Sequence, residues 1–108
     1  MAKGNLNASI ERKKQMANVS KEGVANNYLN ASVIYFNLGK HERCIEFSKK
    51  ALSLAPNIPA AYNNIGASYN ALRQYSMAVD AFTKALQLDP NFQLAKNNLE
   101  ETKKNLGR

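Results

Sequence analysis

The chain has 108 residues, enough for one domain, and its 15 basic and 8 acidic side chains give a formal net charge of +7. No apolar run approaches the roughly 18 residues of a membrane span, and the N-terminus lacks the apolar core of a secretory signal. The one cysteine cannot close an internal disulfide. Together these features predict a cytoplasmic protein.

Residues 1–24 are the least regular part of the sequence, and we expect them to be partly helical or disordered. Ala17 lies 34 positions before Ala51, which favours the second helix of a degraded repeat. The apolar residues that allow a short amphipathic helix here are Ile10, Met16, Ala17 and Val19.

Residues 25–58 read as two helices joined by a turn. Apolar side chains at spacings of three and four predict a first helix that runs from Ala25 to Leu38. Gly39 follows it, as expected just past a helix C-terminus. A second apolar run ends before Pro56, because the residue that precedes a proline is pushed out of the helical region.

Residues 59–92 repeat the same pattern. Pro59 suits the first turn of a helix, where a missing N–H costs nothing, and Pro90 closes the unit. The small residues Gly66 and Ala78 should let its two helices approach closely. Residues 93–108 contain a further helix, in which Leu94, Ala95 and Leu99 supply an apolar side that would cap the last repeat.

A period of 34 residues links these units, and such a period is typical of stacked helix pairs. Asn30 returns as both Asn64 and Asn98. Other residues that recur after 34 positions are Tyr28, Tyr35, Lys50, Ala51, Leu52, Leu54, Pro56 and Asn57.

The second copy resembles the tetratricopeptide repeat through Tyr62, Ile65, Gly66, Tyr69, Ala78, Phe82, Ala85 and Pro90. The first copy departs from that pattern, since Ser32 and Ser48 stand where the family has Gly and Phe. The resemblance implies an all-α, right-handed α-solenoid of antiparallel helix pairs. It would hold two full repeats, 25–58 and 59–92, and a C-terminal capping helix.

Nothing in the sequence indicates an enzyme. One His and one Cys cannot supply the four ligands of a structural zinc site. No Gly-rich phosphate loop is present, and no two carboxylates form an acid–base pair. His41 and Cys44 are interpreted as packing residues. We therefore expect no catalytic residue, metal, cofactor or small-molecule substrate.

The recurring asparagines point to a binding surface. In a solenoid of helix pairs the first helices line the concave groove, so Asn30, Asn64 and Asn98 should form a ladder along it. An amide both donates and accepts, and it can pair with the main chain of a peptide. The arrangement resembles the asparagine ladder in the superhelix of O-linked N-acetylglucosamine transferase. Further candidates for peptide contact are Asn26, Leu29, Val33, Asn37, Asn63, Asn70, Asn97 and Glu101.

One known ligand type is not expected. Tetratricopeptide clamps for chaperone tails hold a C-terminal carboxylate with basic residues from the groove. Uncharged residues occupy the corresponding positions, which include Leu29, Val33, Leu94 and Asn98. We therefore expect no carboxylate capture, and the favoured function is a non-catalytic adaptor that binds a peptide segment of a protein partner.

Three alternatives stay open. The chain could be the recognition part of a larger enzyme, such as a glycosyltransferase, or of an assembly factor. It could also associate with itself, with the helix of residues 8–20 swapped between copies. The basic run Arg12–Lys14 is the only indication of nucleic-acid or membrane-surface binding, and a solvated helix face accounts for it as well.

Overall fold

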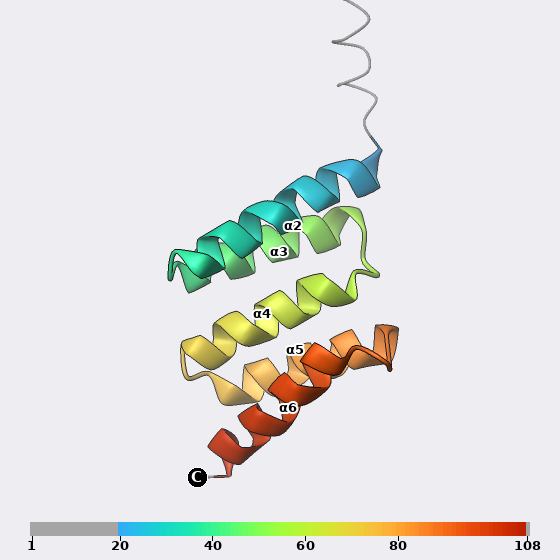
Figure 1. The fold of residues 1–108 in the computed structure, drawn as a ribbon. Coiled ribbons are helices and arrows are strands. Elements are labelled where there is room, and N and C mark those ends of the chain that lie inside the picture. Colours follow the sequence, from blue (N-terminus) through green and yellow to red (C-terminus); the bar gives the residue numbers. More distant parts are fainter. Residues whose placement is uncertain (1–19, 108) are drawn as a thin grey trace, which may run out of the picture.

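The computed structural model describes residues 20–107, and this part of the chain is entirely helical apart from short turns (Figure 1). It confirms the predicted all-α, tetratricopeptide-type fold. The expectations for Ile10 to Val19 and for Arg12–Lys14 lie outside the described residues. The helices are α2 (Lys21–Asn37), α3 (His41–Leu54), α4 (Pro59–Ala71), α5 (Tyr75–Leu88) and α6 (Gln93–Leu106).

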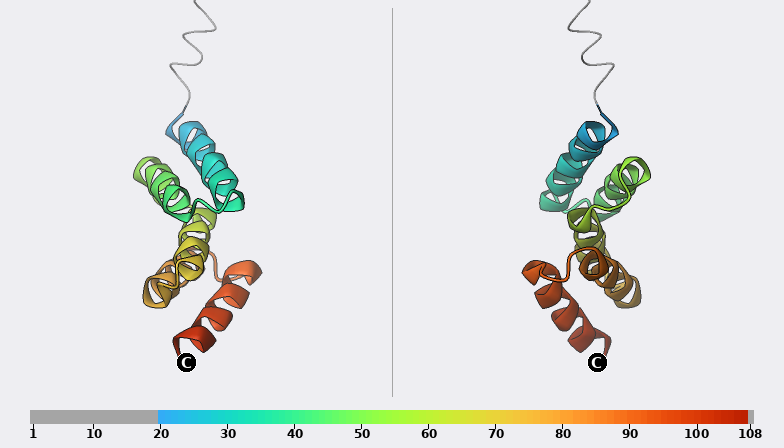
Figure 2. Two further views of the ribbon diagram at one scale, coloured as in Figure 1. Left: turned by 90° about the vertical axis from the view of Figure 1, so that its left-hand side faces the viewer. Right: turned by 90° about the vertical axis from the view of Figure 1, so that its right-hand side faces the viewer.

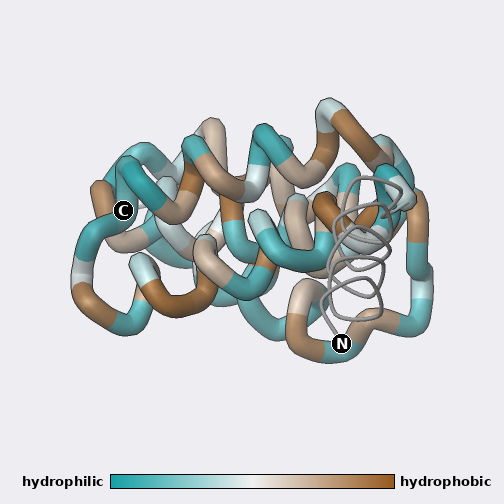
Figure 3. Tube along the Cα trace, turned by 90° about the horizontal axis from the view of Figure 1, so that it is seen from above, coloured by the Kyte–Doolittle hydropathy of each residue, from teal (hydrophilic) through white to brown (hydrophobic). Residues whose placement is uncertain are grey.

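Consecutive helices pack against one another in chain order, so that the molecule grows along one axis (Figures 1 and 2). Helices α2 and α3 form the first hairpin, α4 and α5 form the second, and α6 lies against α5. The first helices also touch directly, α2 with α4 and α4 with α6. Hydrophobic and hydrophilic residues are interspersed along the stack when it is seen from above (Figure 3).

The first helix begins at Lys21, which is earlier than the expected start at position 25. The cause is an N-cap that the apolar pattern did not reveal: the Ser20 hydroxyl accepts a hydrogen bond of 3.1 Å from the Gly23 N–H. An N-cap of this kind satisfies one of the free donors at a helix start. The C-terminal end is as expected, with Gly39 in the left-handed region at φ 77°.

The turns between repeats also follow the sequence. Helix α3 ends at Leu54, and Ala55 before Pro56 is extended, with φ −141°. Pro59 occupies the first turn of α4. In the second repeat the Asp89 carboxylate accepts a hydrogen bond from the Asn91 N–H at 3.1 Å, which fixes the turn around Pro90.

Small residues let the helices approach closely, as Gly66 shows. A Cβ added at Gly66 would lie 2.6 Å from the Phe82 ring, which is fully buried. In the first repeat the equivalent pair is Ser32 and Ser48, and both are also fully buried. The Ser48 hydroxyl has no hydrogen-bond partner among residues 20–107. The first repeat thus replaces a large apolar contact by two small polar groups.

The two residues with reactive side chains serve packing in this structure. Cys44 is fully buried, and its Sγ lies 3.8 Å from the Asn64 carbonyl oxygen. The His41 ring meets the Phe36 ring edge-on, with centroids 5.0 Å apart. Both observations confirm the packing interpretation drawn from the sequence.

The capping helix α6 covers the second repeat only in part with the expected side. Ala95 is fully buried and Leu99 is half-buried, as expected. Leu94 is 54% exposed, although we expected it on the apolar side, and Thr102 is fully buried as well. Thr102 gave no apolar signal, but its hydroxyl donates a hydrogen bond of 3.1 Å to the Asn70 side-chain oxygen, which makes burial tolerable.

Candidate functional site

The first helices form a concave surface. Seen along the edge of the stack, α4 is set back between α2 and α6 (Figure 2). A hollow of about 300 Å³ lies where these three helices meet. Its lining residues are Val33, Phe36, Asn63, Asn64, Ala67, Leu94 and Asn98. The hollow is therefore formed jointly by the first helices of both repeats and by the capping helix.

Four of the expected contact residues meet in this hollow: Val33, Asn63, Asn64 and Asn98. Phe36 and Ala67 also line it, although the sequence analysis did not select them. Ala67 lies 34 positions after Val33, so the repeat register alone could have identified it. Phe36 could have been identified in the same way, because the selected candidate Asn70 lies 34 positions after it.

The asparagine amides join neighbouring first helices. Asn98 Nδ2 donates to Asn63 Oδ1 at 3.1 Å, which links α6 to α4. Asn64 Nδ2 donates to the Ser32 hydroxyl at 3.3 Å, which links α4 to α2. An amide offers two N–H donors and an oxygen with two lone pairs. Asn64 and Asn98 thus retain donor and acceptor capacity that residues 20–107 do not use.

Asn30 differs from its two counterparts. It is exposed on α2 and does not line the hollow, whereas Asn64 and Asn98 are half-buried. The reason is its place in the stack, since Asn64 and Asn98 each face a preceding first helix. The ladder expected from the 34-residue period is therefore uneven along the groove.

The remaining candidates lie outside this hollow. Asn70 accepts the hydrogen bond of the buried Thr102, as described above. Asn97 and Glu101 line a separate, more polar depression on α6, together with Glu100, Lys104 and Asn105. Leu29 and Asn37 line neither of these two depressions.

The hollow carries no charged side chain among its seven lining residues. Val33, Leu94 and Asn98, which correspond to positions of a chaperone-tail clamp, all lie in it. The strongest hydrogen bonds to a carboxylate come from Arg and Lys, and neither lines the hollow. The hollow can instead combine apolar contact with hydrogen bonding to amides.

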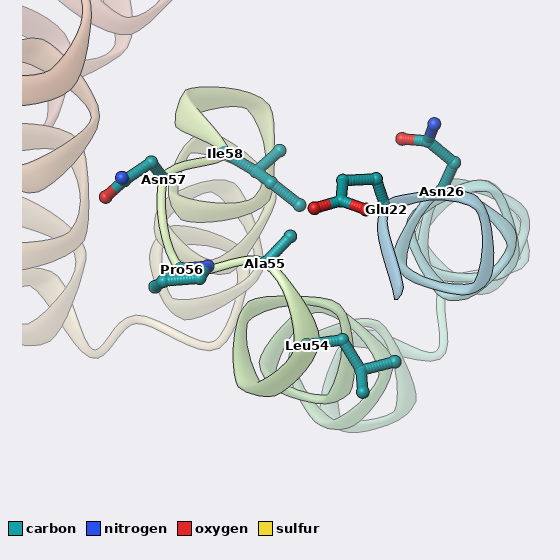
Figure 4. Close-up of a pocket in the computed structure, with 7 residues that line it drawn as sticks. All are labelled: Glu22, Asn26, Leu54, Ala55, Pro56, Asn57 and Ile58. Carbon is teal, nitrogen blue, oxygen red and sulfur yellow. The ribbon is translucent and has the colours of Figure 1, made fainter. Parts of the chain in front are cut away.

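A second hollow of about 350 Å³ lies between the start of α2 and the loop that joins α3 to α4 (Figure 4). Glu22 and Asn26 of α2 border it, and the Glu22 carboxylate points toward Ile58. The other lining residues are Leu54, Ala55, Pro56 and Asn57. One carboxylate beside an apolar wall suits a basic side chain, whose aliphatic stem could lie on Ile58.

Within residues 20–107 there is no group of three or more His, Cys, Asp or Glu side chains placed to hold a metal ion. Over the same residues, every helix is too short or too polar to cross a bilayer.

The tetratricopeptide repeat family matches this sequence over residues 25–58 and again over residues 59–92. The chain belongs to the tetratricopeptide repeat family. Its structure is similar to the first TPR of Spaghetti (RPAP3) bound to the HSP90 peptide SRMEEVD, with a TM-score of 0.75 and 26% identity. That match covers 78% of this chain and 67% of the other.

Two further structures share the fold. The second TPR of Spaghetti, bound to the same peptide, has a TM-score of 0.75 at 23% identity, over 77% of each chain. MamA has a TM-score of 0.74 at 21% identity, over 94% of this chain and 55% of MamA. None of the curated protein sequences compared with this chain gave a significant match.

Proposed function

We propose that this tetratricopeptide repeat protein is a non-catalytic adaptor that binds an extended peptide segment of a protein partner across the hollow between α2, α4 and α6. The observation that carries the proposal is the lining of that hollow, where three amides stand beside exposed apolar side chains. The first TPR of Spaghetti, which is similar to this chain, is bound to a peptide.

The contacts divide into two kinds. Val33 and Leu94, which are 42% and 54% exposed, offer apolar anchors from α2 and α6 on either side of α4. The unused donor and acceptor groups of Asn64 and Asn98 are available to the N–H and C=O groups of a peptide main chain. Main-chain pairing gives affinity without reading sequence, so selectivity would come from the apolar anchors.

The absence of charged side chains from the lining also indicates which peptides should bind weakly. The peptide SRMEEVD bound by the Spaghetti domains has acidic residues at three of its last four positions. With no Lys or Arg among the lining residues, the hollow of this chain offers no strong partner for those charges. We infer that the preferred segment is uncharged and apolar where it crosses the hollow.

A peptide display experiment tests this function. Short random peptides selected on the full chain are titrated against it and against Leu94→Asp. The matched control is Leu106→Asp, because Leu106 is also about half exposed on α6 but does not line the hollow. We expect Leu94→Asp alone to weaken binding by tenfold or more, which corresponds to about 1.4 kcal/mol.

Equal affinity of both variants would contradict the proposed site. The peptide SRMEEVD is a second probe, and we expect it to bind far more weakly than the selected peptides. If SRMEEVD bound tightly and added salt weakened its binding, the hollow would bind charged peptides, which contradicts the inferred preference for an uncharged segment.

A further inference from the structure

The two helices of the first repeat are joined by a stack of three aromatic rings. The Phe47 ring of α3 lies between two tyrosines of α2, with its centroid 6.0 Å from that of Tyr28 and 5.1 Å from that of Tyr35. The Tyr35 and Phe47 rings are within 2° of parallel. Two turns of helix separate the tyrosines, roughly 10.5 Å along the axis, which leaves room for one ring at stacking distance from both.

The second repeat keeps the outer two rings and lacks the central one. Tyr62 and Tyr69 of α4 repeat the two tyrosines of α2 after 34 positions, whereas Ala81 of α5 stands at the position equivalent to Phe47. A hollow of about 240 Å³ is lined by these three residues. The rest of its lining comes from Lys49 of α3 and from Met77, Asp80 and Lys84 of α5. An apolar cavity of about 150 Å³ holds a benzene ring, so this hollow is large enough for one.

A lysine also recurs beside the rings. In the first repeat the Lys50 Nζ lies 4.8 Å from the Phe47 ring centroid and 5.7 Å from that of Tyr28. Its counterpart in the second repeat is Lys84, whose Nζ lies 5.8 Å from the Tyr62 ring centroid. An ammonium group within about 6 Å of a ring centroid is attracted to the face of that ring. A ring placed in the hollow would therefore give Lys84 the second aromatic contact that Lys50 already has.

We propose that the hollow between Tyr62 and Tyr69 binds an aromatic side chain of a partner protein, in the position that Phe47 occupies in the first repeat. The incoming ring stacks between the two tyrosines, rests on the Ala81 methyl group and lies beneath the Lys84 ammonium group. Offset stacking and the cation above the ring both add to the gain from burying its apolar surface.

The lining also specifies the chemistry of the partner. Ala81 is buried at the floor of the hollow, and Met77 supplies an adaptable thioether that makes favourable contacts with ring edges. A phenylalanine fits this floor better than a tyrosine, because a hydroxyl pressed against Ala81 would lose its hydrogen bonds to water. Lys49, Lys84 and Asp80 are all exposed at the rim and carry two positive charges and one negative charge. The preferred segment therefore has an acidic residue beside the phenylalanine.

The ring has to come from another protein. The chain contains five tyrosines, four phenylalanines and no tryptophan. All of these aromatic residues lie within positions 28–92, and each is buried or half-buried. A second copy of the chain would have to withdraw one of these rings from its own packing. A different partner with an exposed phenylalanine has no such cost.

This site is independent of the groove described above. The hollow between α2, α4 and α6 shares no lining residue with the one between α3, α4 and α5. Both can therefore be occupied at the same time, and failure of peptide binding in one leaves the other untouched.

A titration followed by nuclear magnetic resonance tests the site on the full chain. The probe is the tripeptide Asp-Phe-Asp with blocked ends. Two control peptides replace the phenylalanine by glycine or by cyclohexylalanine, which has similar bulk but no aromatic face. We expect Asp-Phe-Asp to shift the methyl signals of Met77 and Ala81 and to bind about fivefold more tightly than the cyclohexylalanine peptide. Equal affinity of these two peptides, or shifts confined to Val33 and Leu94 in the groove, would overturn the proposal.

Two kinds of variant complete the test. Ala81→Phe copies the first repeat and should abolish binding of the probe while keeping the melting temperature at or above that of the parent. Lys84→Gln should weaken binding two- to fivefold, since it removes the cation above the ring. Lys50→Gln is the matched control, because it removes the same charge where Phe47 already fills the stack, and it should leave affinity unchanged. Equal losses for the two lysine variants would reject the proposal even if Ala81→Phe did not fold, as would full binding to a folded Ala81→Phe.

Discussion

Gly66→Ala tests the closest helix contact of the second repeat. The added Cβ would lie 2.6, 2.7 and 2.9 Å from three carbons of the Phe82 ring, whereas ordinary contacts begin near 3.4 Å. The ring has little room to retreat, because Phe82 is fully buried between the helices. Overpacking of this kind costs about 1–3 kcal/mol. Alanine is also a better helix former than glycine by about 1 kcal/mol, which offsets part of that loss.

We therefore expect Gly66→Ala to lower the free energy of unfolding by up to about 2 kcal/mol, measured by urea or thermal denaturation. The double variant with Phe82→Leu separates the two contributions. Once the ring is gone, Gly66→Ala should no longer destabilise the protein and should recover its gain in helix propensity.

A control distinguishes the steric contact from a general effect of alanine. Gly107→Ala would place its Cβ no closer than 3.5 Å to any neighbouring atom, so its effect should be negligible. If the effect of Gly66→Ala were the same with and without the Phe82 ring, the steric account would be refuted.

Three further predictions concern stability. Arg73 adopts φ 62° where the first repeat has Gly39 at φ 77°. Arg73→Gly should therefore raise the free energy of unfolding by about 1 kcal/mol, and Gly39→Ala should lower it by about the same amount. The melting temperatures of the two variants should shift in the same directions. Asn98→Ala leaves the buried Asn63 Oδ1 on α4 without its hydrogen bond and should lower the free energy of unfolding by about 1–3 kcal/mol in a denaturant titration. Asn30→Ala should be close to neutral. Equal losses for the two variants would contradict the uneven ladder. Ser48→Ala removes a buried hydroxyl that has no partner within residues 20–107 and should leave stability unchanged or raise it by about 1 kcal/mol, and a loss in calorimetry would show a hidden partner.

The Asn98 result also bears on function. An asparagine that joins two helices and contacts a peptide will lose both roles on substitution, so binding data for Asn98→Ala need the stability measurement beside them. Leu94 is free of this difficulty because it is half exposed. Variants of Leu94 therefore report on the hollow more directly than those of the amides.

The repeat, its helices and its turns were predictable from the sequence because they depend on local rules. Pro56 and Gly39 mark chain reversals through backbone geometry that no neighbour can change. The apolar spacing gave each helix, and the fixed period of 34 residues gave their stacking and the family. The start of α2 was missed because a hydroxyl cap at Ser20, rather than an apolar residue, sets it.

The candidate site was predictable only in part. The repeat period placed Asn64 and Asn98 on the groove, and both line the hollow. It could not show that their amides are already bonded to Ser32 and Asn63, since those partners lie on other helices. Nor could it show that Asn30, at the same repeat position, stands apart from the hollow.

The sequence by itself therefore determined the type, order and spacing of the helices, because periodicity and turn chemistry act over a few neighbouring residues. Only the tertiary structure decided which equivalent positions of the repeats differ in their burial. Ile34 and Ser68 occupy the same place in two repeats, yet one is exposed and the other fully buried. The physical reason is the end of the stack: a position in a repeat acquires its environment from the helices packed around it. Helix α3 precedes α4, which carries Ser68, and packs on it, whereas no helix within residues 20–107 precedes α2, which carries Ile34.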